Sequence, residues 1–372
     1  MEDLFQADNH EASAIIQNEK AIQPEHDALG PLLRENELKE IADTLRPLLS
    51  HNQSEYLFIH GPAGSGKQTS MRYVLGQLSK ETSKVIPVYV NCWEYPTKMG
   101  VYSRIIETLQ IPIPRRGLAT DEVFARIREH LDRDGLSILL VLDKVNSLIL
   151  RGEEDIFYTI ARANENGRTR FGVVSISIDS QVLERLSDQV RTLLHFTTLE
   201  FKEYSLEQLV EILKDRASKA LSSGSCPTPV LEACAKIGKA NNGNARLALD
   251  ILWKAARKAQ NRGHKRITPE DVEEVSSKTD YARTLAEDCF TDFNMKGMAL
   301  SGDEKLALRI IAKKGEVASS DFYNEFMAVK TISKRQIRNY LGLLDAKGLI
   351  TVRSASKGGL LKGKIIQLLC RR

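Results

Sequence analysis

The sequence predicts an α/β protein: a parallel sheet covered by helices, then an α-helical lid, then a C-terminal winged helix-turn-helix. Three observations predict this fold class. A strand, a glycine-rich loop and a helix follow one another between residues 56 and 70, and strands then alternate with helices up to residue 178. Such alternation is typical of a parallel sheet with helices on both faces. Only helical patterns follow between residues 205 and 278, and residues 303–369 combine three helices with two short strands.

The elements of the sheet domain follow from the spacing of apolar residues. Leu38, Ile41, Leu45 and Leu49 lie on one face of a helix predicted over residues 35–49. The elements predicted after the glycine-rich loop are strand 85–90, helix 101–109, helix 121–131, strand 137–142, helix 154–164 and strand 171–178. This order indicates one parallel sheet.

The elements predicted after the sheet form two further units. Helices over 206–219, 229–237, 244–261 and 269–277 indicate a small lid. Helices at about 303–313, 319–329 and 333–347, followed by strands at 349–353 and 364–369, predict a winged helix-turn-helix. The expected division is a mobile N-terminal arm over residues 1–28, a nucleotide-binding α/β domain over 29–204, the lid over 205–285 and the winged-helix domain over 286–372.

The composition of the 372 residues is that of an ordinary globular protein, with 42% hydrophobic and 27% charged residues. The longest apolar runs, such as residues 138–142, are too short to cross a bilayer, and the first 23 residues lack the features of a secretion signal. We therefore expect a cytoplasmic protein with no membrane partner. The five cysteines are scattered without a C-x-x-C pair, which favours reduced thiols over zinc ligands.

The net charge of +4 conceals an asymmetry along the chain. Residues 296–372 contain 16 Lys and Arg against 6 Asp and Glu, a balance of +10, which leaves −6 for the rest. Regular apolar periodicity distinguishes this segment from a disordered basic tail. The C-terminal unit is therefore expected to meet a polyanion.

Residues 56–70 carry the pattern of a phosphate-binding loop. The glycines let the backbone curl with its N–H groups inward, Lys67 supplies a positive charge, and the following helix adds its dipole. The apolar strand before the loop and the helix after it argue against a merely structural glycine turn. Gln68 stands where a Ser or Thr normally ligates the Mg²⁺ of the nucleotide. The expected nucleotide-binding residues of this loop are Gly61, Ala63, Gly64, Ser65, Gly66, Lys67, Gln68 and Thr69.

A second nucleotide-site element ends the apolar strand over residues 138–143. In P-loop ATPases an aspartate at this place, here Asp143, helps to hold Mg²⁺, and the next residue is usually a glutamate that polarises the attacking water. Lys144 cannot do that, because a lysine is a proton donor at pH 7 and would repel the metal. The alternative is a buried strand that merely ends in a polar turn.

With these motifs the chain resembles the AAA+ initiator proteins of archaea, relatives of the origin-recognition and cell-division-control proteins. The likeness runs from about Pro24 to Leu369. Its carriers are residues 34–37, the phosphate-binding loop, and residues 88–92, 140–143, 175–179, 190–191, 203–204 and 243–250. The resemblance implies ATP or ADP and Mg²⁺ as cofactors. It implies double-stranded origin DNA, the replicative helicase and paralogous initiator subunits as partners.

The resemblance also implies roles for individual residues. Lys67 should contact the β and γ phosphates, and Asp143 the metal. Tyr204 and Arg216 match lid-side positions that flank the adenine and the nucleotide. Arg246 matches the lid arginine that reaches the γ-phosphate and couples it to the lid angle. Arg191 falls near an arginine offered to the nucleotide of a neighbouring subunit.

Three catalytic positions depart from the family pattern. Gln68 replaces the metal-binding hydroxyl, Lys144 the catalytic carboxylate, and Ile178 a polar residue that senses the γ-phosphate. Since removing one such group typically costs on the order of 10²-fold in rate, we expect hydrolysis to be slow or absent. Binding should persist, because the backbone loop, Lys67 and Arg246 remain.

DNA contacts are expected mainly from the winged helix. Ile337, Leu341 and Leu344 should point to the core, and Ser333 is a natural N-cap. The residues left to face DNA at the start of this helix are Lys334, Arg335, Arg338 and Asn339, and the hairpin tip adds Lys357, Lys362 and Lys364. Arg115 and Arg116 lie near a DNA-contacting insertion of the family, although an ordinary exposed loop is an equal reading.

Three functions fit these patterns. The first, which we favour, is a replication initiator whose nucleotide state sets its grip on origin DNA and helicase. The second is a regulator that binds DNA with or without nucleotide and competes with an active paralogue. The third is an active AAA+ loader ATPase, against which Gln68 and Lys144 argue.

Overall fold

The protein forms two compact units, residues 1–278 and residues 279–372. The structure, a computed structural model, describes residues 15–23, 30–50, 53–112, 117–166, 170–278, 303, 306–308, 310–311, 316–330, 333–346, 350–355 and 363–368. Within these residues no helix is long and apolar enough to cross a membrane.

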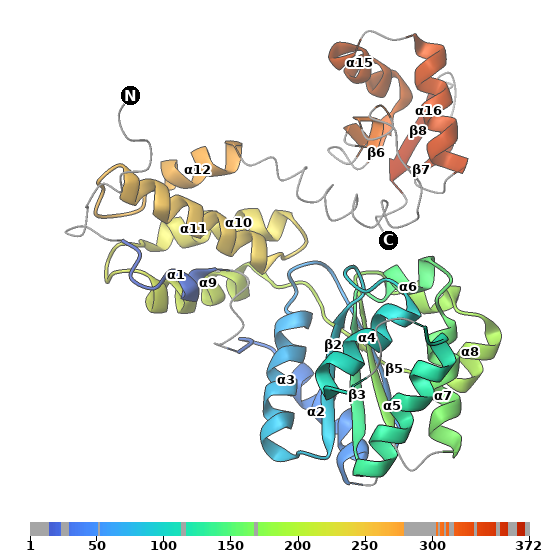
Figure 1. Cartoon of the computed structure of the whole chain (residues 1–372). Helices are drawn as coiled ribbons and strands as arrows, with labels where there is room; N and C mark the ends of the chain where they lie inside the picture. Colours follow the sequence, from blue (N-terminus) through green and yellow to red (C-terminus); the bar gives the residue numbers. More distant parts are fainter. Residues whose placement is uncertain are drawn as a thin grey trace. The chain divides into compact units, whose positions relative to one another are not determined.

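The first unit is built on a five-stranded parallel sheet (Figure 1). Its strands are β1 (Tyr56–His60), β2 (Val85–Asn91), β3 (Ser137–Asp143), β4 (Phe171–Ser177) and β5 (Thr197–Glu200), in the order β2-β3-β4-β1-β5. Four of the strands were predicted, within a residue or two. The fifth, β5, was not predicted, because it is a short edge strand of which only Leu199 is buried.

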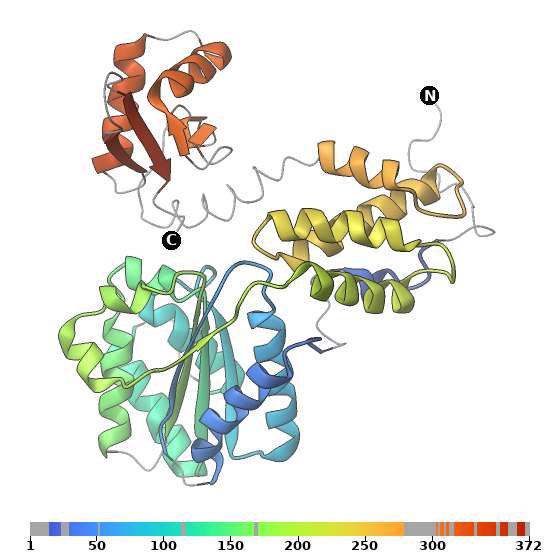
Figure 2. The same ribbon diagram turned by 180° about the vertical axis from the view of Figure 1, so that it is seen from behind.

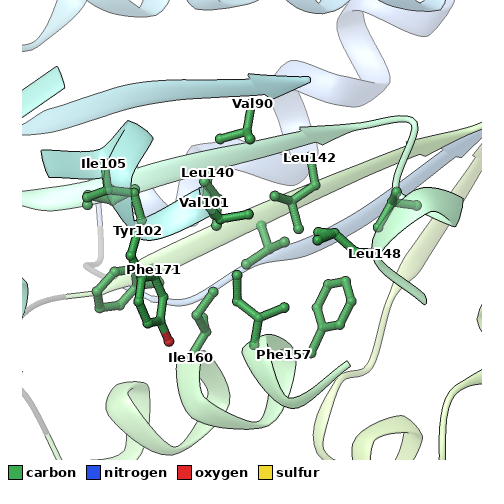
Figure 3. Close-up of a cluster of buried hydrophobic side chains, with 14 of the residues drawn as sticks. Val90, Val101, Tyr102, Ile105, Leu140, Leu142, Leu148, Phe157, Ile160 and Phe171 are labelled. Carbon is green, nitrogen blue, oxygen red and sulfur yellow. The ribbon is translucent and has the colours of Figure 1, made fainter. Parts of the chain in front are cut away.

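Helices cover both faces of this sheet. On one face lie α2 (Glu35–Ser50) and α3 (Lys67–Glu81), and on the other α4 (Lys98–Leu109), α5 (Thr120–Asp134) and α7 (Asp155–Asn166). Figure 3 shows the second layer, where Tyr102, Phe157 and Phe171 pack among aliphatic side chains of the sheet. Burying one such side chain stabilises the fold by roughly 1.5–3 kcal/mol, so the sheet is a rigid support for the loops at its edge. Short helices α6 (Asn146–Leu150) and α8 (Asp188–Leu193) complete this layer.

The predicted lid is present as four helices (Figure 2). They are α9 (Leu206–Ala220), α10 (Thr228–Ala240), α11 (Ala245–Asn261) and α12 (Pro269–Lys278). A capping box begins α9, in which the Ser205 hydroxyl accepts from the backbone N–H of Gln208. The small residues of α11, such as Ala248, Ala255 and Ala256, are fully buried and let the other helices approach closely.

The N-terminal arm differs from the prediction where the structure describes it. Ile15, Ala21 and Ile22 are buried, and a short helix α1 (Glu19–Ile22) packs on α9 and α11. Ile16 forms an antiparallel bridge with Leu221. The prediction that this part of the arm is mobile is wrong. Its few apolar residues are buried by the lid, which lies far along the chain, so no local pattern indicated their burial. Residues 1–14 and 24–28 lie outside the described residues.

The second unit contains helices and a three-stranded antiparallel sheet. Its elements are β6 (Glu316–Ala318), α15 (Ser319–Val329), α16 (Lys334–Ala346), β7 (Ile350–Ala355) and β8 (Gly363–Leu368), with strand order β6-β8-β7. The predicted hairpin is β7 and β8, whereas β6 was not predicted. The prediction that Ile337, Leu341 and Leu344 face the core is confirmed, since all three are buried.

The thiols are also as expected in the described residues. Cys92, Cys226 and Cys234 are unpaired, and burial raises the pKa of each thiol. Cys289 and Cys370 lie outside the described residues.

Candidate functional site

The phosphate loop, residues 61–67, joins the buried strand β1 to α3. Gly66 precedes the helix with a φ of 93°, and Lys67 is its first residue. The Lys67 ammonium donates to the carbonyls of Gly61 (2.7 Å) and Pro62 (2.8 Å). The side chain is thus held within the curl of the loop, and a phosphate would have to replace these two carbonyls as its partner. Burial lowers the pKa of Lys67 to about 8, against the opposing effect of Asp143.

The lid touches the phosphate loop at Gly64. This glycine has a φ of +72°, and a Cβ there would lie 2.0 Å from Oδ1 of Asn244. Asn244 is the N-cap of α11, because its side chain accepts from the backbone N–H of Leu247 (3.0 Å). The backbone N–H of Ala245 donates to the Gly64 carbonyl (3.3 Å). The start of a lid helix is therefore bonded directly to the backbone that would hold phosphate.

Tyr204 and Arg34 also lie against the phosphate loop. The Tyr204 hydroxyl would lie 2.7 Å from a Cβ at Gly66, so this predicted site residue does lie against the loop. The Arg34 guanidinium stacks over the Tyr204 ring, 4.1 Å from its centroid. Burial raises the pKa of the Tyr204 hydroxyl, with Arg34 acting in the opposite direction.

Arg34 is a site residue that sequence reasoning missed. It is 4% exposed, and its Nε donates to the Ser65 carbonyl (3.1 Å) in the phosphate loop. Its Nη2 donates to the Lys202 carbonyl (2.5 Å), and its Nη1 pairs with Glu37. One side chain therefore connects α2, the phosphate loop and the segment that leads into the lid. The only signal in the sequence was its place beside Glu35 and Glu37 in the segment that carried the resemblance.

Asp143, the predicted metal ligand, lies at the end of β3 and is 5% exposed. The Tyr89 hydroxyl donates to its Oδ2 (2.7 Å). Burial and the neighbouring Asp143 raise the pKa of Tyr89, so this hydroxyl keeps its proton at any physiological pH.

The structure brings Gln68 and Arg246 together across the site. Nη2 of Arg246, in the first turn of α11, donates to Oε1 of Gln68 (3.0 Å), which follows Lys67 in α3. The lid arginine therefore reaches the edge of the phosphate loop, as expected for a residue that would meet a nucleotide.

The other two altered positions lie at the ends of β3 and β4. Lys144 has a φ of +57° and its ammonium lies 3.4 Å from the centroid of the Trp93 ring. Ile178 is 48% exposed. Neither side chain can polarise a water molecule, which is the reason given from the sequence for expecting slow or absent hydrolysis.

Arg216 and Arg191 are two further residues for which the resemblance implies a role at a nucleotide. Nη1 of Arg216 donates to the Ala21 carbonyl (3.4 Å) of the docked N-terminal segment. Arg191, on α8, is exposed and pairs with Asp188. The role predicted for each remains a prediction.

The basic helix of the second unit has the predicted orientation. Lys334, Arg335, Arg338 and Asn339 are exposed, on the side of α16 opposite its buried residues. Ser333 caps the helix, because its hydroxyl accepts from the backbone N–H of Gln336 (3.3 Å). The residues Arg115, Arg116, Lys357 and Lys362 lie outside the described residues, as does the side chain of Lys364.

Comparison with known proteins assigns a class to this fold and site. Residues 51–186 match the AAA domain family, and residues 210–277 match the Cdc6 AAA+ ATPase-type lid domain. The chain thus combines an AAA domain with a Cdc6-type lid domain.

Proteins similar to this chain over nearly its whole length come from archaea. The chain is 29% identical to an ORC1-type DNA replication protein 1 of Sulfolobus acidocaldarius, over 90% of this chain and 85% of the relative. It is similar in structure to the Aeropyrum pernix ORC1 protein in complex with DNA (TM-score 0.68, 26% identity, 96% and 94% covered). It is also similar to Cdc6p from Pyrobaculum aerophilum (TM-score 0.65, 27% identity, 95% and 94% covered). The chain is therefore similar over nearly its whole length to archaeal ORC1-type and Cdc6 proteins, which confirms the resemblance stated from its motifs.

Proposed function

We propose that this protein is a replication initiator that binds ATP or ADP and double-stranded origin DNA and helps to recruit the replicative helicase. The observation that carries the proposal is the direct bonding of the lid to the phosphate loop and the residue after it, through the backbone N–H of Ala245 and the side chain of Arg246. A polyphosphate entering the loop has to displace or extend these contacts. Nucleotide binding would therefore change the position of the lid.

The nucleotide part of the proposal rests on the backbone and the cations around the loop. Inward N–H groups, the dipole of α3 and the Lys67 charge favour a polyphosphate. Asp143 was expected to meet the Mg²⁺ of the nucleotide, and Tyr89 already bonds one of its oxygens. Gln68, Lys144 and Ile178 support slow or absent hydrolysis.

The DNA part of the proposal rests on the second unit. Its exposed cations, Lys334, Arg335 and Arg338, stand at the N-terminal end of α16, where recognition helices meet base edges. We read α15, α16 and the β7-β8 hairpin as parts of a winged helix-turn-helix, whose wing would carry Lys357, Lys362 and Lys364. The relative from Aeropyrum pernix was solved with DNA, which supports the same role here. Paralogous initiator subunits are further candidate partners, and Arg191 would face the nucleotide of such a neighbour.

Footprinting on the organism's own chromosome, with and without ATP, tests this function. We expect protection of discrete sites that changes with ATP, and loss of that change in Lys67→Ala. Protection that is identical with and without ATP would favour the competing regulator. Brisk, Lys67-dependent phosphate release over many turnovers would favour the active loader ATPase.

A further inference from the structure

We propose that this site holds the polyphosphate of its nucleotide without a divalent cation. The inference rests on the proposed nucleotide binding and concerns how the same site neutralises the phosphate charge. P-loop sites normally present Mg²⁺ with a Ser or Thr hydroxyl after the loop lysine and with an aspartate at a strand end. In this chain both positions are altered or already bonded to donors of the protein.

The strand-end carboxylate is bonded on one oxygen. Oδ2 of Asp143 accepts the Tyr89 hydroxyl at 2.7 Å, and the carboxylate is buried. A metal approaching this oxygen would have to displace a hydrogen bond to a charged acceptor, which is stronger than one between neutral groups. Mg²⁺ also demands a strict octahedral arrangement of its ligands. Asp143 is therefore a poor ligand as it stands.

The position after Lys67 is bonded as well. Oε1 of Gln68 accepts from Nη2 of Arg246 at 3.0 Å. The same amide is also hydrogen-bonded to Tyr89, which acts to lower the pKa of that tyrosine. An uncharged amide that already accepts a hydrogen bond from a guanidinium should bind a metal more weakly than the usual hydroxyl does.

The charge around the loop is already positive. The electrostatic neighbours of Lys67 are two cations, Arg34 and Arg246, and one carboxylate, Asp143. Guanidinium groups bind phosphate oxygens in a planar fork, so Arg246 can neutralise the charge that a metal carries elsewhere.

The test is the affinity of the full-length protein for a fluorescent ATP analogue, measured in excess MgCl₂ and in excess EDTA. We expect the two dissociation constants to agree within about threefold. Binding that weakens by more than about tenfold in EDTA would overturn the inference and leave the proposed function standing. Failure to bind in either buffer would reject the proposed nucleotide binding, and this inference with it.

Two variants test whether Gln68 and Tyr89 are the reason for binding without a metal. Gln68→Thr supplies the missing hydroxyl and should introduce a preference for MgCl₂ over EDTA of about tenfold, whereas Gln77→Thr, on an exposed turn of the same helix, should not. Tyr89→Phe frees Oδ2 of Asp143 and should act in the same direction. If neither Gln68→Thr nor Tyr89→Phe creates a metal preference, the role given to these residues is wrong.

Discussion

The phosphate loop and the strand-end residues Asp143, Lys144 and Ile178 are the two parts of the site predicted from the sequence, and they keep the family pattern to different degrees. The loop keeps its glycines, its lysine and its helix start, and its backbone carbonyls accept hydrogen bonds from Ala245 of the lid and from Arg34. At the strand ends two of three positions have lost the polar group that hydrolysis needs. A site made from backbone is constrained by close packing, whereas a catalytic side chain can be exchanged without disturbing the fold. This difference is the basis for proposing nucleotide binding with slow or absent hydrolysis.

The largest effect should come from removing the side chain that supports the loop. Arg34→Ala leaves the carbonyls of Ser65 and Lys202 and the Glu37 carboxylate without their partner. We expect a loss of about 3–5 kcal/mol in the free energy of unfolding, measured by denaturant titration. Arg46→Ala removes an exposed arginine of the same helix, paired with Asp43, and should cost less than about 1 kcal/mol. Equal effects of the two substitutions would show that Arg34 does not support the loop.

A smaller but more specific effect is expected at the contact of lid and loop. Gly64→Ala combines a φ of +72° with a Cβ 2.0 Å from Asn244, so the loop or the lid must move. Strain of this kind costs about 1–3 kcal/mol, which predicts nucleotide binding weakened about 5- to 150-fold. Gly76→Ala, in α3 with no atom near its added Cβ, should leave affinity unchanged and slightly raise stability. Unaltered affinity in Gly64→Ala would contradict the packing described for the loop.

The pKa of Lys67 predicts opposite pH dependences for folding and for binding. In the free protein this pKa is about 8, below the 10.5 expected for the unfolded chain, so between these values the unfolded chain binds more protons. The free energy of unfolding should therefore rise between pH 8 and 10.5, by up to about 3 kcal/mol.

Nucleotide affinity should fall over the same window, because the ammonium that meets the phosphates is lost. Thermal unfolding and fluorescence titrations across this range test both signs. Lys67→Gln provides the control, since it should remove both dependences. A rise in affinity above pH 8 in the wild-type protein would exclude Lys67 as the phosphate contact.

The affinity of the second unit for DNA should depend on salt concentration, and substitutions of its cations should change that dependence. If Arg338 contacts a phosphate, Arg338→Ala should reduce the slope of log affinity for DNA against log salt by about 1. The triple change at Lys357, Lys362 and Lys364 should reduce it further, and Arg126→Ala, on the exposed side of α5, should not change it. An unchanged slope in the triple variant would count against the wing.

The smallest effect is expected from restoring one catalytic group. Lys144→Glu puts a carboxylate back at the end of β3, but Gln68 and Ile178 remain altered. We expect phosphate release to rise by less than about threefold, because groups that act together in catalysis are strongly non-additive. A gain of about 10²-fold would mean that Lys144 alone suppresses hydrolysis.

Patterns among neighbouring residues were sufficient to predict the elements that depend only on short spacings along the chain. The phosphate loop, the apolar strands β1 to β4 and the cap at Ser333 could be read from neighbouring residues, because strand burial, helix caps and glycine turns depend on short spacings. The outward face of α16 followed from the same helical periodicity.

Tertiary structure decided the features that depend on contacts between distant residues. Strand β5 exists through its backbone pairing with β1, and the segment Ile15 to Gln23 gains its burial from the lid. Arg34, Tyr89 and Asn244 become part of the site only because folding brings α2, β2 and the start of α11 to the same loop. The spacing of residues along the chain does not predict these contacts, because the free energy that stabilises them is gained only when the distant partners are already in place.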